Sequence, residues 1–311
     1  MENKKIATRD SYGKALLELA REHDNVVALD ADLAESTRSG MIRKEFPERF
    51  FDCGIAEANM VSAAAGMATT GLVPFVSSFA MFATGRAFEQ IRNAVGYPHL
   101  NVKICASHAG ISVGEDGATH QCLEDIALMR TIPGMVVMCP SDDVETRKAV
   151  QAAYEYQGPV YIRTGRLAVP VFHEEDAEFK IGKGEVIHEG NDITIVATGL
   201  MVEEARQAAL QLEEKGISCR VINICTIKPI DEEILIQAAK ETGCIVTAEE
   251  HNIIGGLGEA VATVLAEKCP CKVKRVGVED KFGTSGPAKE VLELYGLCAA
   301  NLVKVCEEAL K

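Results

Sequence analysis

Short apolar runs alternate with amphipathic stretches from one end of the chain to the other. Residues 10–23 place Leu16, Leu19 and Ala20 at helical spacing, and an apolar run follows at 25–30. Nearly continuous apolar strands between helices are typical of a parallel sheet that is covered on both faces. In this first block we expect strands at 25–30, 50–53, 72–77, 102–107, 135–139 and 159–163, and helices at 10–23, 57–70, 85–95, 122–131 and 143–156.

A second block of the same kind follows an acidic stretch without periodicity, residues 171–179 (VFHEEDAEF). There we expect strands at 193–197, 219–224, 245–249 and 273–278, and helices at 202–215, 231–242, 257–267, 287–294 and 299–310. The predicted fold is α/β, with two three-layer α/β/α domains. Residues 1–170 form a domain with a parallel sheet, and residues 180–311 form a smaller domain with a mixed sheet.

Composition narrows the classes of function. The chain has 46 acidic and 32 basic residues, which gives a net charge of −14 and disfavours binding to nucleic acid. We find no signal peptide after Met1 and no apolar run near the ~20 residues that cross a bilayer, so we expect a cytoplasmic chain without a membrane segment. The 11 cysteines include no C-x-x-C pair. We therefore expect buried, reduced thiols and no metal site made by this chain.

Side chains that could take part in binding or catalysis follow the predicted strands of the first block. Ligands of open α/β sheets bind beyond the carboxyl ends of the strands, so these residues should share one rim. In chain order they are Asp32 and Ser36, Ile55 and Glu57, Phe79 and Phe82, His108, and Arg166.

Glu57 begins a predicted helix whose first turns are small and apolar. Such a carboxylate can simply interact with the helix dipole. Alternatively, a carboxyl group in apolar surroundings can keep its proton and share it with a ring nitrogen of a ligand. Phe79 and Phe82 are either core residues or the walls of an apolar slot for a flat heterocycle.

Residues 108–121 form the least ordinary stretch, because three glycines permit a tight loop around His108, Asp116 and His120. The spacing of these three residues does not match a structural zinc site. We therefore favour hydrogen bonding to a polyol over metal binding as their role. Arg9, Arg163 and Arg166 are candidates for binding a phosphate, as arginines can do with two parallel hydrogen bonds.

The glycine-rich residues 253–258 (IIGGLG) lead into a predicted helix of the second block. Such a turn either binds an anion or serves as a structural connection between strand and helix.

Four of these segments resemble transketolase and, less closely, deoxyxylulose-phosphate synthase: residues 51–59 (FDCGIAEAN), 78–82 (SFAMF), 108–121 and 285–287 (SGP). The resemblance implies a pyrimidine-binding domain followed by a transketolase C-terminal domain. The diphosphate-binding domain of that family contains Gly-Asp-Gly, which this chain lacks. We therefore expect thiamine diphosphate as cofactor, Mg²⁺ held mainly by a separate N-terminal subunit, and a dimer of heterodimers.

The resemblance also implies roles for individual residues. Glu57 would bond the aminopyrimidine ring and, with His120, act in catalysis. Ile55, Phe79 and Phe82 would line the cofactor's ring. Sugar hydroxyls and the phosphate would be bound by Arg9, Ser36, His108, Asp116, His120 and Arg166. The sequence departs from the family at Gly85, where a third aromatic residue is common, and at Ala58, where His or Gln is usual.

The expected reaction is transfer of a two-carbon ketol unit from a ketose phosphate to an aldose or aldose phosphate, in the pentose phosphate route or a dedicated sugar pathway. One alternative is the E1 β subunit of a 2-oxo-acid dehydrogenase, which shares the two-domain layout. Another is an assembly subunit without catalysis. Retention of Glu57, His108, Asp116, His120 and Arg166 argues against this last possibility.

Overall fold

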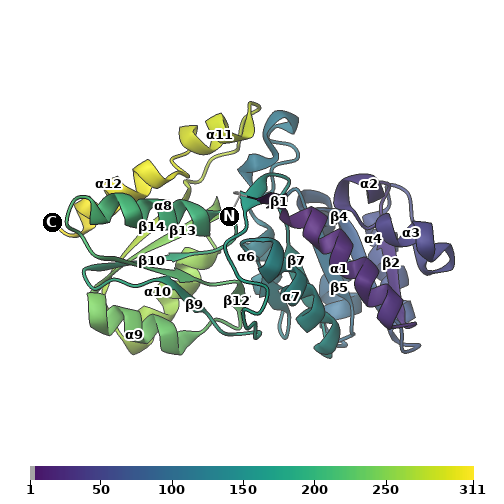
Figure 1. The fold of residues 1–311 in the computed structure, drawn as a ribbon. Helices are drawn as coiled ribbons and strands as arrows, with labels where there is room; N and C mark the ends of the chain where they lie inside the picture. The colour runs from purple at the N-terminus through teal and green to yellow at the C-terminus, as the bar shows by residue number, and fades with distance from the viewer. Residues whose placement is uncertain (1–3) are drawn as a thin grey trace.

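The computed structural model describes residues 4–311 and consists of two α/β lobes that lie side by side (Figure 1). The strands of the first half are β1 (Lys5–Ala7), β2 (Val26–Asp30), β3 (Phe50–Asp52), β4 (Val73–Phe79), β5 (Lys103–Ser107), β6 (Val136–Met138), β7 (Val160–Arg163) and β8 (Ala168–Pro170). Its helices are α1 (Thr8–Glu22), α2 (Ala34–Thr37), α3 (Met41–Glu45), η1 (Pro47–Arg49), α4 (Glu57–Ala68), η2 (Met81–Arg86), α5 (Phe88–Gln90), η3 (Ile91–Gly96), η4 (Ile111–Asp116), α6 (Asp125–Arg130) and α7 (Asp143–Glu155).

The second half repeats the alternation of strand and helix. Its strands are β9 (Glu185–His188), β10 (Ile193–Ala197), β11 (Cys219–Asn223), β12 (Thr226–Lys228), β13 (Cys244–Asn252) and β14 (Lys272–Val278). Its helices are α8 (Met201–Glu213), α9 (Glu232–Thr242), α10 (Leu257–Lys268), α11 (Ala288–Leu294) and α12 (Ala299–Ala309).

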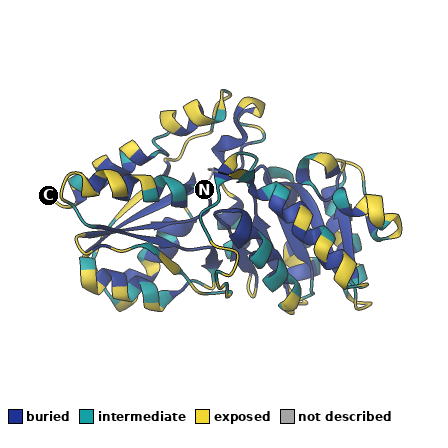
Figure 2. Ribbon diagram, viewed as in Figure 1, coloured by how far each residue is buried: buried dark blue, intermediate teal, exposed yellow. Residues whose placement is uncertain are grey.

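The larger sheet has the strand order β12-β6-β7-β5-β4-β2-β3. Its strands run parallel except β12, which pairs antiparallel with β6. Every residue of β2, β4, β5 and β7 is buried, because helices cover both faces (Figure 2). The expected α/β fold with a parallel-dominated first sheet is confirmed, with one antiparallel strand added from the second half of the chain.

The smaller sheet has the order β14-β13-β10-β11-β9, and only β9 runs antiparallel to its neighbour. This is the mixed sheet that was expected. The sequence pattern did not predict β1, β8, β9 or β12, which are three or four residues long. A run of that length shows no periodicity, so partners elsewhere in the chain decide whether it becomes a strand.

The helix predicted at 85–95 is replaced by two π-helical turns, η2 and η3, on either side of the short helix α5. Thr84 contributes to this, because its hydroxyl donates to the carbonyl of Ala80 at 2.7 Å. Single π turns inside helices are frequent at functional sites. Here the irregular segment follows β4 in the sequence and packs against α4. It carries Phe82 and Arg86.

One hydrophobic core crosses the boundary between the lobes. Ile224, Ile227 and Leu235 of the second half belong to the same buried cluster as Met135 and Val137 of the first. The 11 cysteines are free, and most of them are buried. The lobes are therefore joined by packing and by a shared sheet as well as by the chain itself.

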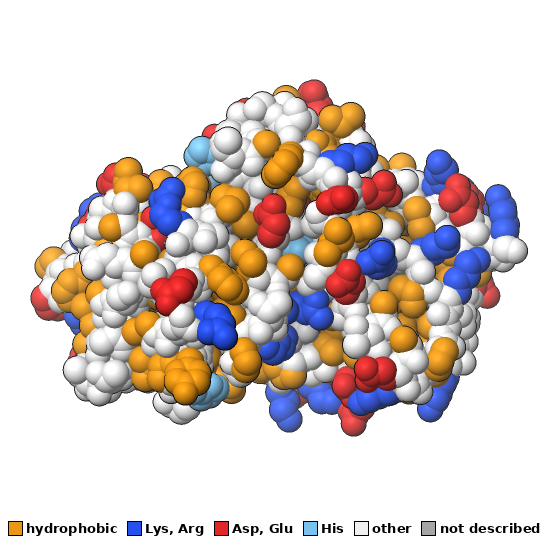
Figure 3. All heavy atoms as spheres, turned by 180° about the vertical axis from the view of Figure 1, so that it is seen from behind, with side chains coloured by type: hydrophobic (Ala, Val, Ile, Leu, Met, Phe, Trp, Pro, Cys, Tyr) orange, Lys and Arg blue, Asp and Glu red, His pale blue; other side chains and the backbone are white. Residues whose placement is uncertain are grey.

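No helix among residues 4–311 combines the length and the apolar character that crossing a membrane requires. Seen from behind, the surface carries acidic and basic side chains interspersed with hydrophobic ones (Figure 3). The net charge of −14 is therefore not gathered into one acidic patch on that face.

Candidate active site

Glu57 is the first residue of α4, and its side chain is 1% exposed. Arg86 Nη1 donates to Glu57 Oε2 at 2.6 Å, and Ser78 Oγ lies 3.4 Å from Oε1. The guanidinium carbon of Arg86 lies 4.9 Å from the centre of the Phe82 ring. Sequence reasoning expected apolar surroundings for Glu57 and did not anticipate Arg86. Arg86 lies four residues after Phe82 in a helical stretch, and that spacing is the sequence signal that could have indicated it.

Two phenylalanines and two histidines meet next to this carboxylate. The rings of Phe79 and Phe82 are stacked with centroids 6.0 Å apart, and His108 stacks on Phe79 at 3.8 Å. His120 meets the Phe82 ring edge-on at 5.3 Å. The structure therefore places residues from β4, η2 and the loop after β5 around one apolar wall, as the strand-end argument predicted.

His108 is buried and has a left-handed backbone, with φ of 54°. Arg9 Nη1 lies 3.1 Å from its Nε2, and Ser107 Oγ lies 2.9 Å from its Nδ1. Because arginine only donates, Nε2 accepts, and Nδ1 carries the proton and donates to Ser107. Burial, with Arg9 and Arg166 nearby, lowers the pKa of His108 to about 3, so its imidazole is neutral near pH 7.

The candidate phosphate residues gather on the other side of His108. Arg9 Nη1 also donates to the backbone oxygen of Ser36 at 3.0 Å. Arg166 donates to the backbone oxygen of Val113 at 2.6 Å and pairs with Glu115 at 2.8 Å. Among the described residues the buried Nε of Arg9 has no hydrogen-bond partner, so the Arg9 guanidinium retains capacity for an anion.

Two candidates lie further out. Asp116 ends η4 and is exposed, and Ile55 precedes α4 with 75% of its surface exposed. The structure thus brings together Glu57, Phe79, Phe82, His108, His120, Arg9, Ser36 and Arg166, and it leaves Ile55 and Asp116 at the rim. The roles of all ten stay predictions.

Two other candidates have structural roles. Arg163 is buried, and its Nε donates to Asp125 at 2.8 Å, so it is not available to a phosphate. The turn at 253–258 already holds an anion of the chain itself. The carboxylate of Glu249 accepts from the backbone N–H groups of Leu257 and Gly258 at 2.7 and 2.8 Å. This turn is therefore the structural connection between β13 and α10.

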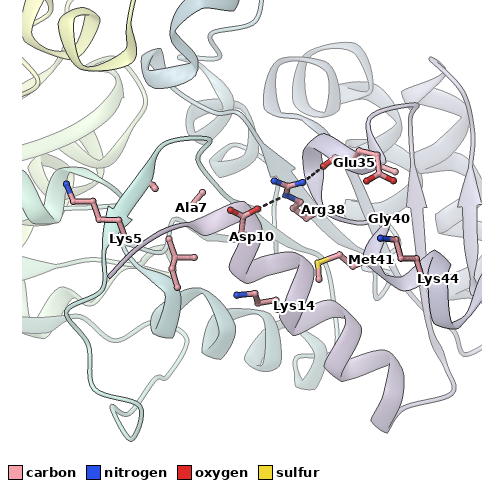
Figure 4. A pocket seen from close by; sticks show the side chains of 12 residues that line it. Lys5, Ala7, Asp10, Lys14, Glu35, Arg38, Gly40, Met41 and Lys44 are labelled. Atoms are coloured by element: carbon pink, nitrogen blue, oxygen red, sulfur yellow. Dashed lines mark hydrogen bonds and ion pairs between the residues drawn. The ribbon is translucent and has the colours of Figure 1, made fainter. Parts of the chain in front are cut away.

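A cavity of about 460 Å³ opens elsewhere on the first lobe, and Glu57 is not among the residues that line it. Figure 4 shows its lining. Its lining includes Lys14, Arg38 and Lys44 from α1 and the segment around α3. Arg38 is committed to Asp10 at 2.5 Å and to the backbone oxygen of Glu35 at 3.0 Å. Helix α2 contributes to the wall, and Ser36 belongs to the same short helix, so the cavity adjoins the candidate phosphate residues.

Comparison with known proteins assigns the two halves of the chain. Residues 4–171 match the transketolase pyrimidine-binding domain, and residues 182–302 match the transketolase C-terminal domain. A chain from Methanocaldococcus jannaschii described as a transketolase C-terminal section is 52% identical, covering 97% of this chain and 96% of that one. A chain from Phocaeicola vulgatus, described as one subunit of an apulose-4-phosphate transketolase, is 42% identical and covers 100% of both chains.

A solved structure shares both the sequence and the fold. It is a split-gene transketolase, described as an inactive β4 tetramer, with a TM-score of 0.91 and 51% identity over 99% of each chain. These matches extend over the whole chain and not over one motif. The chain therefore belongs to the transketolase family, and it comprises the pyrimidine-binding and C-terminal domains of that family.

Proposed function

We propose that this chain holds the pyrimidine half of thiamine diphosphate together with a sugar phosphate, and moves a two-carbon ketol unit to an aldose or aldose phosphate. The observation that carries the proposal is the buried carboxyl of Glu57 at the end of an aromatic wall made by Phe79 and Phe82. The two histidines on that wall give it polar groups that suit a sugar.

The donors present fit one half of the cofactor. A carboxyl group and stacked aromatic rings suit a planar aminopyrimidine, which needs a hydrogen-bond partner and an apolar surface. Among residues 4–311 no group of three or more His, Cys, Asp and Glu residues could hold a metal ion. We therefore propose that a divalent cation such as Mg²⁺ and the diphosphate are held by a separate N-terminal subunit, in a dimer of heterodimers.

When bound, thiamine diphosphate supplies the nucleophilic carbon that breaks and remakes the carbon–carbon bond of the sugar. Glu57 exchanges a proton with the pyrimidine ring. Its Oε2 accepts from Arg86 at 2.6 Å and its Oε1 lies 3.4 Å from Ser78 Oγ, so these two residues would hold the carboxyl group in place for that exchange. Phe82 and Phe79 keep water away from that proton and fix the plane of the ring.

The neutral imidazole of His108 and the ring of His120 bond the hydroxyls of the sugar, and His120 takes part in proton transfer at the reacting carbon. Asp116 reaches the sugar from the rim. Arg9, Ser36 and Arg166 bind the phosphate, for which Arg9 offers the Nε that has no partner among the described residues. Ile55, which is exposed, would help to hold the cofactor.

The comparisons give no support to the alternative of a 2-oxo-acid dehydrogenase subunit. The relative from Phocaeicola vulgatus is described as a transketolase of a sugar phosphate, apulose 4-phosphate. We therefore keep sugar phosphates as the substrate class. The ketose and aldose pair, in the pentose phosphate route or another pathway, has to come from the assay.

The test is an activity assay of this chain alone and mixed with its partner subunit, with thiamine diphosphate, Mg²⁺, xylulose 5-phosphate and ribose 5-phosphate. We expect activity only in the mixture. A panel of other ketose phosphates and of 2-oxo acids follows in the same format. Turnover of 2-oxo acids without turnover of any sugar phosphate would overturn the proposed reaction.

A further inference from the structure

The loop formed by residues 108–121, here called the substrate loop, is held by a residue of the other domain. Glu250 lies near the end of β13 and is buried, with 4% of its surface exposed. Its Oε1 accepts the backbone N–H of Ser112 at 2.6 Å. A hydrogen bond from a buried N–H to a carboxylate is about twice as strong as a neutral one.

Arg163 stabilises the charge of Glu250. Arg163 Nη2 donates to the backbone oxygen of Glu250 at 2.8 Å, and Nη1 lies 4.0 Å from the carboxylate. Arg163 is fixed in turn by Asp125. Burial raises the pKa of the Glu250 carboxyl, and Arg163 opposes that shift.

The loop and Glu250 are in direct contact. Gly110 has φ of +82°, and a Cβ atom at this position would lie 2.2 Å from the carboxyl carbon of Glu250. Only glycine gives both the backbone conformation and the space. A side chain at position 110 would therefore have to displace the carboxyl group of Glu250.

The other end of the loop is also tied to the second domain. The side-chain amide of Gln121 donates to the backbone oxygens of Ile111 at 3.0 Å and Thr284 at 2.9 Å. Helix α11 of the second domain packs against η4, which lies within the substrate loop. Figure 1 shows α11 above the junction of the two lobes. Both ends of the substrate loop thus depend on residues 250 and 284, far from the loop in sequence.

We infer that Glu250 is a positioning residue, through which the C-terminal domain holds the substrate loop in the conformation that presents His108, Asp116 and His120 to the sugar. The inference rests on the proposed function, because it assigns the loop to substrate binding. Without the carboxylate the loop must be ordered by the substrate itself, and that cost appears as a higher KM.

The experiment compares three variants in the reconstituted two-chain enzyme. We expect Glu250→Ala to raise the KM for the ketose phosphate about tenfold, a loss of ~1.4 kcal/mol in binding. Glu250→Gln should recover most of that loss, since its amide oxygen still accepts from Ser112. The affinity for thiamine diphosphate, measured by calorimetry, should change less than twofold, because Glu57 and Phe82 lie outside the loop.

Glu249→Ala is the matched control. Glu249 is an equally buried carboxylate on the same strand, but it bonds the start of α10 and not the loop. We expect it to lower the melting temperature and to leave the KM within twofold of the wild type. A rise in KM as large as that of Glu250→Ala would show that any damage to the second domain has this effect and would overturn the inference.

A readout independent of turnover separates this inference from the proposed function. Hydrogen exchange of the peptide covering the substrate loop should become at least tenfold faster in Glu250→Ala and remain unchanged in Glu249→Ala. If Glu250→Ala does not fold, Gln121→Leu removes the second tie and should have the same two effects. Unchanged exchange in the loop of either folded variant would overturn the inference, even if the enzyme is active on sugar phosphates.

Discussion

At the scale of single residues, the site depends on side chains whose partners come from distant parts of the chain. Glu57 is the clearest example. It is bonded to Arg86, 29 residues away, and Arg86 lies over the ring of Phe82. The carboxyl is therefore fixed in position before any ligand arrives, by a group that the helix pattern alone did not reveal.

We expect Glu57→Gln to lower kcat about 10³-fold in the reconstituted enzyme, because the amide cannot exchange a proton with the ring. The side chain keeps its shape, so the melting temperature should stay within a few degrees of the wild type. Steady-state kinetics and thermal unfolding measure the two quantities. Glu89→Gln, a change of an exposed carboxylate nearby, should leave both unchanged. Near-normal turnover of Glu57→Gln would refute the catalytic assignment.

Arg166 is held by Glu115 at 2.8 Å, and both side chains are partly exposed. We expect Arg166→Ala to raise the KM for phosphorylated sugars about tenfold, and the KM for unphosphorylated sugars by less than twofold. Glu115→Gln frees the guanidinium and should leave the KM for the phosphate unchanged or lower. Equal effects of Arg166→Ala on both kinds of sugar would remove its phosphate role.

At the scale of elements, the stretch between the domains proves to be an anchored segment. The sequence pattern at 171–179 predicted only an acidic connection. In the structure His173 Nδ1 lies 3.1 Å from Asp142, which caps α7, and Nε2 lies 3.0 Å from Glu185 on β9. The imidazole, 5% exposed, thus joins the two lobes by two ion pairs. These contacts, although opposed by burial, raise the pKa of His173 to about 10.

This shift predicts a pH dependence of stability. A folded-state pKa above the unfolded value of about 6.5 gives stability that is complete below pH ~6.5 and is lost as the pH rises through about 10. We expect His173→Gln to lower the free energy of unfolding by about 2 kcal/mol at pH 6, as for hydrogen bonds to charged groups. Denaturant unfolding at pH 6, 8 and 10 measures the difference from wild type.

That difference should shrink steadily and be close to zero above pH 10. Glu185→Gln removes one of the two partners and should show a smaller effect with the same trend. A difference between wild type and His173→Gln that does not vary with pH would show that the imidazole is neutral in the folded chain.

At the scale of the whole molecule, the lobes share a sheet and a core. Strand β12 belongs to the second half of the chain but pairs with β6 of the first. Ile227 of that strand is 2% exposed within the buried cluster that spans both lobes. The two lobes are therefore packed against each other through this strand and this cluster.

We expect the chain to unfold in a single transition. Cys105 and Cys219 are buried in the first and second lobes and serve as separate probes. Labelling with a thiol reagent across a denaturant series, read by mass spectrometry, should give coincident midpoints. Ile227→Ala should lower both midpoints together, at a cost of about 2–4 kcal/mol. Midpoints that separate in the wild type would show that the lobes unfold independently.

Much of this organisation could be predicted from the sequence. The strands β2, β4, β5, β10 and β11 are mostly apolar and buried, and a pattern-based argument finds them because burial on both faces selects apolar residues locally. The rule that ligands bind at strand ends then places Glu57, Phe79, His108 and Arg166 on one rim without any knowledge of their contacts.

Only the tertiary structure decided which partners these side chains have. Three contacts join segments that are far apart in the sequence. Arg86 bonds Glu57 across 29 residues, Glu250 bonds the substrate loop across 138 residues, and β12 of the second half pairs with β6 of the first. Arg163 and the turn at 253–258 are candidates for binding an anion in the sequence, yet Asp125 neutralises the first and the chain's own Glu249 occupies the second. The sequence by itself determined the form of the longer segments and the family of the chain, because periodicity and motifs are local. The contacts that fix the site are not local, and they exist only once burial has brought distant charges together.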